Sequence, residues 1–382
     1  MNSNDPHARA QLAQRAWQHF RAGTTDLASA TLEVPLAAYT DADRYAHEVS
    51  RVFLQRPLPW ALGLELPRPG DYLAREYLGR PVLLTRQPDG SVQAFLNVCR
   101  HRGAVLCPSG RGHQSRFTCP YHAWTYDAAG RLVGVYGSAS FGDFDRDQRG
   151  LTRLPCVERA GLVWVVLTPG LELDIDGWLG GMGPLLESLN LGALHLFEQR
   201  ELAGSGWKAT LDGYLEIYHH NSVHQGTVGP HTVGNLLVHD TFGPHQRLTI
   251  ARPTLDEVSD PAQLAADPDR YVRLVHSVFP NLSISGIVGG LLLVGQVFPG
   301  PTPDRTVTLQ SILCPSPPQE DAELEAVRQF SAMTLQAVRD EDYAIVGRVQ
   351  AALHSGANQT FLIGRNEPAI QHYHRWVSEL SA

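Results

Sequence analysis

The stretches Asn97-Val-Cys-Arg-His-Arg-Gly103 and Cys119-Pro-Tyr-His-Ala-Trp-Thr-Tyr126 decide how the first half of this 382-residue chain folds. Each stretch places one cysteine and one histidine close together, and seventeen residues separate the two pairs. Two such pairs on adjacent hairpin loops can surround one metal centre. The candidate ligands are Cys99, His101, Cys119 and His122, while Cys107 lies outside the pattern and is expected to be a packed thiol.

Two kinds of metal site suit two thiolates and two imidazoles. In a Rieske-type [2Fe–2S] cluster, the thiolates stabilise ferric iron and the imidazoles favour the ferrous state of the second iron. This ligand set raises the reduction potential by roughly hundreds of millivolts relative to all-cysteine clusters. A tetrahedral structural zinc site is the alternative. Zinc sites usually pair like ligands along the chain, whereas each stretch here supplies one of each kind, which favours the iron–sulfur cluster.

The sequence around these stretches predicts a compact all-β unit over residues 55–168. The apolar run Val82–Leu84, the turn at Asp89-Gly90 and the return from Val92 to Val98 predict a hairpin. The run Leu162–Leu167 predicts a further strand. The unit is therefore expected to be rich in turns and short strands.

Helical patterns flank this unit. Residues Pro6–Ala22 predict a helix, and Asp41 can cap a second helix that runs to about Phe53. Further on, the period of apolar residues predicts a helix over Trp207–Tyr218. Strands are expected at Leu291–Phe298 and Thr306–Leu313, followed by a long helical stretch over Glu320–Leu353.

A second group of candidate ligands lies in residues 212–224, Asp-Gly-Tyr-Leu-Glu-Ile-Tyr-His-His-Asn-Ser-Val-His. Asp212, Glu216 and His219 are spaced to share one face of the predicted helix. Two poor helix formers after His220 can end that helix and let His224 turn back toward His219. Two histidines and one carboxylate with open positions opposite form the site of ferrous oxygenases. Isolated histidines are more often packing residues, and His220 stays ambiguous.

Together with Gly130 and Gly206-Trp207-Lys208, these motifs resemble the α subunit of Rieske non-haem iron ring-hydroxylating oxygenases, over most of the chain. The resemblance implies that the two Cys-His pairs hold a [2Fe–2S] Rieske cluster. It also implies a mononuclear Fe(II), because the family spacing of carboxylate, two residues, His, four residues and His selects His219 and His224 as ligands.

The resemblance places the third iron ligand on a late helix. The stretch Glu341-Asp342-Tyr-Ala-Ile-Val-Gly-Arg-Val-Gln350 resembles that helix, with the ligand at Asp342. Asp340 and Glu341 remain alternatives, and three adjacent acids could also be only a solvated helix start.

Glu216 stands where family members commonly carry aspartate. The resemblance implies that this carboxylate bridges His219 to His122 of a neighbouring subunit and carries electrons between the two metal centres. That role implies a ring of subunits, typically a homotrimer. Asp212 is either a second residue behind the ligands or part of the charged face of the helix, and both interpretations stay open.

The fold class expected from the resemblance is α+β. Residues 1–54 would form a helical segment that packs on the catalytic domain, and residues 55–168 the all-β Rieske domain. Residues 169–382 would form the catalytic mononuclear iron domain, an antiparallel sheet packed by helices in the helix-grip or START-like manner.

The function implied is that of a terminal oxygenase. It would use O2 and NAD(P)H electrons from a separate ferredoxin or flavin reductase, because the chain shows no convincing GxGxxG fingerprint. The expected substrate is small and aromatic or otherwise hydrophobic. The alternative is a monooxygenase that demethylates or hydroxylates a methoxy or quaternary ammonium compound such as choline, carnitine or betaine, which Glu216 favours. An electron carrier is a remote alternative, since residues 170–382 count against it.

The substrate pocket leaves only a weak trace in the sequence. The glycine- and leucine-rich stretch Ser283–Leu293 suggests a mainly apolar cavity wall. An ordinary β-core would have the same composition, so both interpretations stay open.

The composition excludes several other classes. The net charge of −8 argues against a nucleic-acid partner. No apolar run reaches the ~18 residues that span a bilayer, and no apolar signal-peptide core is evident, so we expect a cytoplasmic protein without a membrane partner. Five scattered cysteines argue against a disulfide framework.

Overall fold

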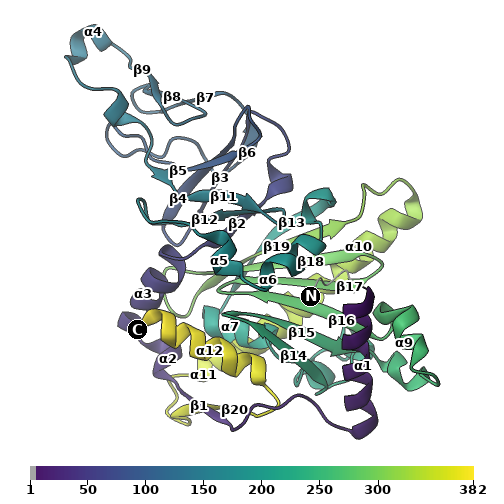
Figure 1. The fold of residues 1–382 in the computed structure, drawn as a ribbon. Coiled ribbons are helices and arrows are strands. Elements are labelled where there is room, and N and C mark those ends of the chain that lie inside the picture. The colour runs from purple at the N-terminus through teal and green to yellow at the C-terminus, as the bar shows by residue number, and fades with distance from the viewer. Residues whose placement is uncertain (1–5) are drawn as a thin grey trace. The chain divides into compact units, whose positions relative to one another are not determined.

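The computed structural model describes residues 6–382, which divide into two compact units (Figure 1). One unit is Phe53–Trp178, and the other combines the segment that ends at Val52 with Leu179–Ala382. The smaller unit is rich in strands, and the larger one has a sheet covered by helices. The α+β class predicted from the sequence is confirmed.

Three small antiparallel sheets form the smaller unit, in the orders β10-β5-β4-β3-β6, β11-β12-β2 and β7-β8-β9. The predicted hairpin is confirmed, because β4 pairs with β5 from Val82↔Leu96 to Arg86↔Val92 around the turn at Asp89-Gly90. The elements are β2 (Leu58–Leu62), β3 (Asp71–Tyr77), β4 (Arg80–Arg86), β5 (Val92–Leu96), β6 (Gly110–His113), β7 (Arg116–Thr118), β8 (Thr125–Asp127), β9 (Leu132–Gly134), α4 (Ser138–Phe141), β10 (Arg153–Leu154), β11 (Cys156–Arg159), β12 (Leu162–Val165) and α5 (Ile175–Leu179).

The larger unit is built on one seven-stranded antiparallel sheet of order β13-β19-β18-β17-β16-β15-β14. Apart from β13, each strand lies beside its neighbour in the sequence, so short hairpins connect most of the sheet. The two predicted strands correspond to β18 and β19. The strands are β13 (His195–Gly204), β14 (Leu237–Phe242), β15 (His245–Ala251), β16 (Val272–Val278), β17 (Leu282–Val288), β18 (Leu291–Pro299) and β19 (Thr306–Cys314).

Helices cover both faces of this sheet. The predicted first helix is confirmed as α1, whose Leu12 and Ala16 pack against Val238 and Leu274 on one face. None of the described helices is long and apolar enough to cross a membrane. The remaining elements of this unit are α1 (Pro6–Ala22), β1 (Leu32–Pro35), α2 (Ala37–Thr40), α3 (Ala42–Glu48), α6 (Met182–Ser188), α7 (Trp207–Tyr214), α8 (His220–Val223), α9 (Ala262–Ala266), α10 (Asp321–Leu335), α11 (Tyr343–Ala352), β20 (Thr360–Ile363) and α12 (Pro368–Ser381).

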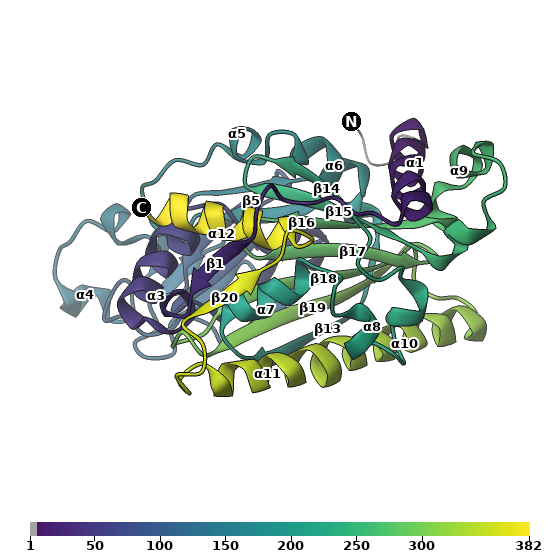
Figure 2. The ribbon, with the colours of Figure 1, turned by 90° about the horizontal axis from the view of Figure 1, so that it is seen from below.

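The long helical stretch predicted at Glu320–Leu353 is present, with one irregularity. Figure 2 shows α10 and α11 as one continuous rod beside the sheet. A π-helical segment, Gln336–Asp342, joins the two helices. Such wide turns hold one extra residue and occur frequently at functional sites.

The helix predicted over Trp207–Tyr218 is confirmed up to Tyr214 and wrong beyond it, because α7 ends there. Glycine at position 213 weakens its last turn. Beyond it, the Glu216 carboxylate accepts hydrogen bonds from the backbone N–H groups of Tyr218 and His219. This local turn competes with the helix. Asp212, Glu216 and His219 therefore do not share one helix face.

A buried ion pair fixes α7 to α3. The Lys208 ammonium donates to Glu48 over 2.7 Å, and the two side chains are 4% and 1% exposed. Asp41 caps α3 as predicted, by accepting from the N–H of Arg44. The Arg44 side chain also reaches Glu48, from the partly exposed side.

Glu48→Gln should destabilise the larger unit by about 3–5 kcal/mol, because it leaves the buried Lys208 charge without its counter-charge. Urea unfolding followed by circular dichroism measures this loss. Arg44→Gln is the matched control, since it removes the more exposed partner of the same carboxylate and should cost about 1 kcal/mol or less. Equal losses in the two variants would contradict the assignment.

Candidate metal centres

The first group of candidate ligands converges at one end of the smaller unit. Cys99 and Cys119 are each 3% exposed, and their thiols are close enough to hydrogen-bond to one another. The His101 and His122 rings lie side by side with centroids 4.7 Å apart. Thiols that pair on the buried side and imidazoles that pair on the outer side suit a cluster in which two cysteines hold one iron and two histidines hold the other.

Aromatic residues enclose this first centre. Trp124 stacks on His101 at a centroid distance of 4.8 Å. The Tyr126 hydroxyl lies 3.4 Å from Cys99 Sγ and accepts the backbone N–H of Arg100. Cys107 lies apart from the four ligands, since its backbone and thiol bond to the Asn97 side chain, which agrees with the interpretation of Cys107 as a packed thiol.

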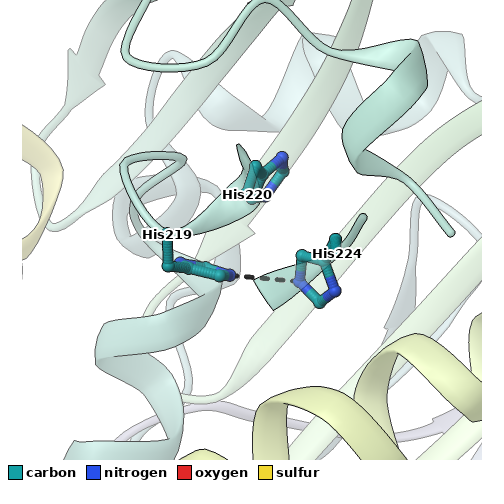
Figure 3. Close-up of side chains that lie close together, drawn as sticks. All are labelled: His219, His220 and His224. Carbon is teal, nitrogen blue, oxygen red and sulfur yellow. Dashed lines mark hydrogen bonds between the residues drawn. The ribbon is translucent and has the colours of Figure 1, made fainter. Parts of the chain in front are cut away.

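The second group brings three ligand atoms to one point in the larger unit. His219 Nε2 and His224 Nε2 are 3.1 Å apart (Figure 3), and Asp342 Oδ1 lies 2.9 Å from His224 Nε2 and 3.4 Å from His219 Nε2. Metal–ligand bonds of about 2.1 Å at right angles put neighbouring ligand atoms about 3 Å apart. The three atoms therefore fit one face of an octahedral metal, the arrangement of two histidines and one carboxylate.

A carboxylate holds each of the two rings from its other side. Glu216 accepts from Nδ1 of His219, and Glu341 Oε2 lies 2.7 Å from Nδ1 of His224. A proton on Nδ1 leaves the Nε2 lone pair free to face the centre. Thr227 also donates to Glu341, which keeps this carboxylate in place.

The charges of the site reinforce one another. Burial by itself would lower the pKa of His219, but hydrogen bonds to Asp342 and then Glu216 raise it to about 9. Burial works in the opposite sense on Asp342, yet the two histidines hold the pKa of this carboxyl below its usual range. Positive rings around a carboxylate anion suit a site in which a cation replaces the ring protons.

Local structure decides which of the three adjacent acids faces the histidines. Asp342 ends the π-helical segment and points toward both rings, while Glu341 lies behind His224. Asp340 pairs with the exposed Arg339. On the other side, the chain after His224 turns back so tightly that a side chain at Gly229 would collide with the His224 carbonyl.

Known proteins share both halves of this architecture. A family profile described as "Ring hydroxylating alpha subunit (catalytic domain)" matches residues 191–382, and one described as "Rieske [2Fe-2S] domain" matches residues 59–144. The chain belongs to the ring-hydroxylating oxygenase α-subunit family. Members of this family carry a Rieske [2Fe–2S] cluster and a mononuclear iron, and the two sites described above fit these groups.

The relatives within the family act on different compounds. Carnitine monooxygenase oxygenase subunit of Escherichia coli K12 is 34% identical over 201 residues, which cover 50% of this chain and 52% of the relative. Chlorobenzene dioxygenase subunit alpha of Cupriavidus sp. PS12 is 40% identical over 144 residues, which cover 37% and 32%. The chain thus spans about half the length, or less, of these curated relatives.

A solved structure agrees in fold. A quaternary ammonium Rieske monooxygenase in complex with L-carnitine superposes with a TM-score of 0.79 at 23% identity, covering 94% of this chain and 97% of the other. At this identity the likeness concerns the fold alone.

In the present chain, a cavity of about 100 Å³ opens beside His219, His224 and Asp342. Its floor is the sheet face opposite α1, where alternate residues of neighbouring strands point inward. Apolar residues predominate in the lining, and the stretch Ser283–Leu293, whose role the sequence left open, contributes Ser283, Ser285 and Leu293 to it. The lining strand residues are Leu248, Ile250, Arg273, Val275, Ser283, Ser285, Leu293 and Gly295.

Two predicted residues are not part of the converging set of His219, His224 and Asp342, although the His220 ring contacts both histidine rings. Asp212 accepts from the Tyr39 hydroxyl at 2.7 Å and lies 2.8 Å from His374 Nε2, so it belongs to a buried network between α7 and α12. His220 lines the cavity, and its pKa falls to about 2 because it is buried and lies near Arg273. Its ring points away from the line that joins His219 and His224 (Figure 3).

Sequence reasoning missed two residues of this site. The sequence predicts Glu341 only as an alternative ligand, whereas its carboxylate holds the His224 ring from behind. Arg273 is not among the predicted site residues, and the one signal for it is an arginine within the apolar stretch Val272–Val278.

Glu341→Ala should lower the iron affinity of the site by about 10- to 100-fold, because His224 loses the hydrogen bond that orients it. Iron titration of protein stripped of mononuclear iron measures the change. Glu341→Gln should recover part of the affinity, since its amide oxygen still accepts from Nδ1. If the alanine variant binds iron as tightly as the parent, Glu341 does not support the site.

Proposed function

We propose that this chain is a terminal oxygenase component that hydroxylates a small aromatic or otherwise apolar compound with O2. Its electrons would come from NAD(P)H through a separate ferredoxin or flavin reductase. The observation that carries the proposal is the convergence of His219 Nε2, His224 Nε2 and Asp342 Oδ1 at the wall of an apolar cavity.

These three residues would hold the mononuclear iron. Bound iron supplies the activation of O2 beside the substrate. The residues of the chain orient that chemistry, because all three ligands approach from one side and leave the cavity side open. The apolar lining excludes water from the cavity and favours a hydrophobic substrate body.

Cys99, His101, Cys119 and His122 would hold the Rieske cluster, which supplies electrons one at a time. We further propose a homotrimer in which Glu216 links His219 of one subunit to His122 of the next. The position of Glu216 supports this role, since it holds His219 from the side away from the ligand atoms. Its neighbour Tyr218 is exposed, which leaves this side accessible to a second subunit.

The second candidate is a monooxygenase that demethylates or hydroxylates a quaternary ammonium or methoxy compound. The similarity to carnitine monooxygenase favours it, as does glutamate rather than aspartate at position 216. An electron carrier without oxygenase activity is disfavoured, because electron transfer alone does not require a second metal site at His219, His224 and Asp342.

Asp342→Ala should reduce the iron content from about three atoms per chain to about two, and leave the visible spectrum of the cluster unchanged. Iron analysis beside absorption spectroscopy measures both. Asp340→Ala is the control, because Asp340 pairs with an exposed arginine and should keep all the iron. Loss of the cluster spectrum in Asp342→Ala, or loss of iron in Asp340→Ala, contradicts the proposed ligand.

The oxygenase proposal predicts a hydroxylated product from an aromatic acid when the purified protein receives O2 and electrons from a surrogate reductase. Mass spectrometry with labelled O2 detects the incorporated oxygen. L-carnitine and choline serve as the comparison, and trimethylamine or formaldehyde from them would favour the second candidate. Electron uptake without any oxygenated product would leave only the electron carrier.

A further inference from the structure

Arg273 is a buried cation that lines the iron-site cavity. Arg273 is 8% exposed, and its Nε has no hydrogen-bond partner among residues 6–382. Its one weak contact is from Nη2 to the Thr232 hydroxyl at 3.5 Å. In the same described range, no carboxylate forms an ion pair with it.

The strand register places Arg273 on the sheet face that lines the cavity, and its side chain also borders a second cavity of about 420 Å³ beside Arg9 and Arg252. Arg273 stands opposite Ile250 of β15 and two residues from Val275, and all three line the same cavity as Asp342. His220 lies beside it, 7% exposed, and its Nδ1 is likewise without a partner in the described part of the chain. Arg273 Nε and His220 Nδ1 are therefore two buried polar atoms without a partner in the described residues, and both residues line this cavity.

The charge balance makes this arrangement unfavourable without a ligand. Burial and then the nearby Arg252 lower the pKa of Arg273 to about 10, which still leaves the guanidinium charged near neutral pH. Asp269, whose charge acts on Arg252, is itself paired with Arg9. Buried charges in proteins are normally paired, so this cation requires an anion that the chain does not provide.

We propose that Arg273 binds the carboxylate of the substrate, with His220 Nδ1 as a second donor, and that the substrate is a carboxylic acid with a compact apolar body. A guanidinium offers Nε–H and Nη–H in the planar fork that matches a carboxylate. The proposal rests on the proposed oxygenase function, because it places the apolar body in the cavity beside His219, His224 and Asp342.

The rest of the cavity lining bears on whether the substrate body is an uncharged apolar group or a quaternary ammonium group. Apolar side chains such as Ile217, Val228 and Val338 dominate, and among the described lining residues Tyr214 alone carries a phenyl-type ring. Quaternary ammonium groups are usually held by several aromatic rings. A cavity with one such ring suits an uncharged apolar body better than a trimethylammonium group.

Direct binding tests the proposal with the iron-loaded protein. Isothermal titration uses four compounds, namely benzoate, its neutral analogue benzamide, L-carnitine and inorganic phosphate. Together they separate the contribution of the carboxylate from that of the apolar body. We expect benzoate to bind with one site per chain and at least tenfold more tightly than benzamide or phosphate. Phosphate that binds as tightly as benzoate would indicate an unspecific anion site. L-carnitine that binds more tightly than benzoate would contradict the preference for an uncharged apolar body. Either result overturns the proposal.

Arg273→Met should weaken benzoate binding by at least tenfold and leave benzamide binding within twofold. Arg273→Lys retains the charge but not the planar pair of N–H donors, so its benzoate affinity should lie between those of the parent and of Arg273→Met. Unchanged benzoate affinity in Arg273→Met overturns the proposal, provided that circular dichroism and iron content match the parent.

Ile250→Asp keeps the test decisive if Arg273→Met does not fold. It supplies an internal carboxylate opposite Arg273, so the folded variant should lose benzoate binding while Arg273 remains. Retained benzoate binding in this variant overturns the proposal. Benzoate that binds through Arg273, with no oxygenated product from any compound of the product screen, would instead remove the oxygenase function and leave the anion site standing.

Discussion

Two hydrogen bonds, one to Nδ1 of His219 and one to Nδ1 of His224, fix the orientation of both rings, and the elements of the larger unit must be packed so that these bonds can form. Glu216 and Glu341 bind the Nδ1 atoms, so both Nε2 atoms face one point, which Asp342 completes. Glu216 lies after α7, whereas Glu341 and Asp342 end the π-helical segment. The geometry of the centre therefore depends on the packing of α7 and of the rod formed by α10 and α11, and the buried Glu48–Lys208 pair fixes the first of these.

Local spacing made much of this predictable. The Cys-His pairs and the spacing of His219 and His224 indicate metal sites from the amino-acid sequence alone, because ligand spacing is a local property. The helix end at Tyr214 was not predictable from period alone, since a side-chain-to-backbone turn at Glu216 overrides it. The positions of Glu341 behind His224 and of Arg273 in the cavity wall are not predictable from spacing, because they depend on residues that are distant in sequence.

The cavity brings two kinds of charge close together. Carboxylates lie behind and beside His219 and His224, and the Arg273 guanidinium acts on His220, whose ring contacts both of these histidines. Arg273 and His220 are both buried, so the charges are poorly solvated. A ligand that carries its own charge at one end is therefore oriented before any specific contact along its body is made.

The π-helical segment Gln336–Asp342 separates two functions that one regular helix would couple. An extra residue within a helix rotates everything beyond it by about 100° relative to what precedes it. The apolar face of α10 can therefore stay on the sheet while Asp342 turns toward the histidines. Deletion of one residue from this segment would turn Asp342 away from the histidines, with the sheet and its covering helix left as they are.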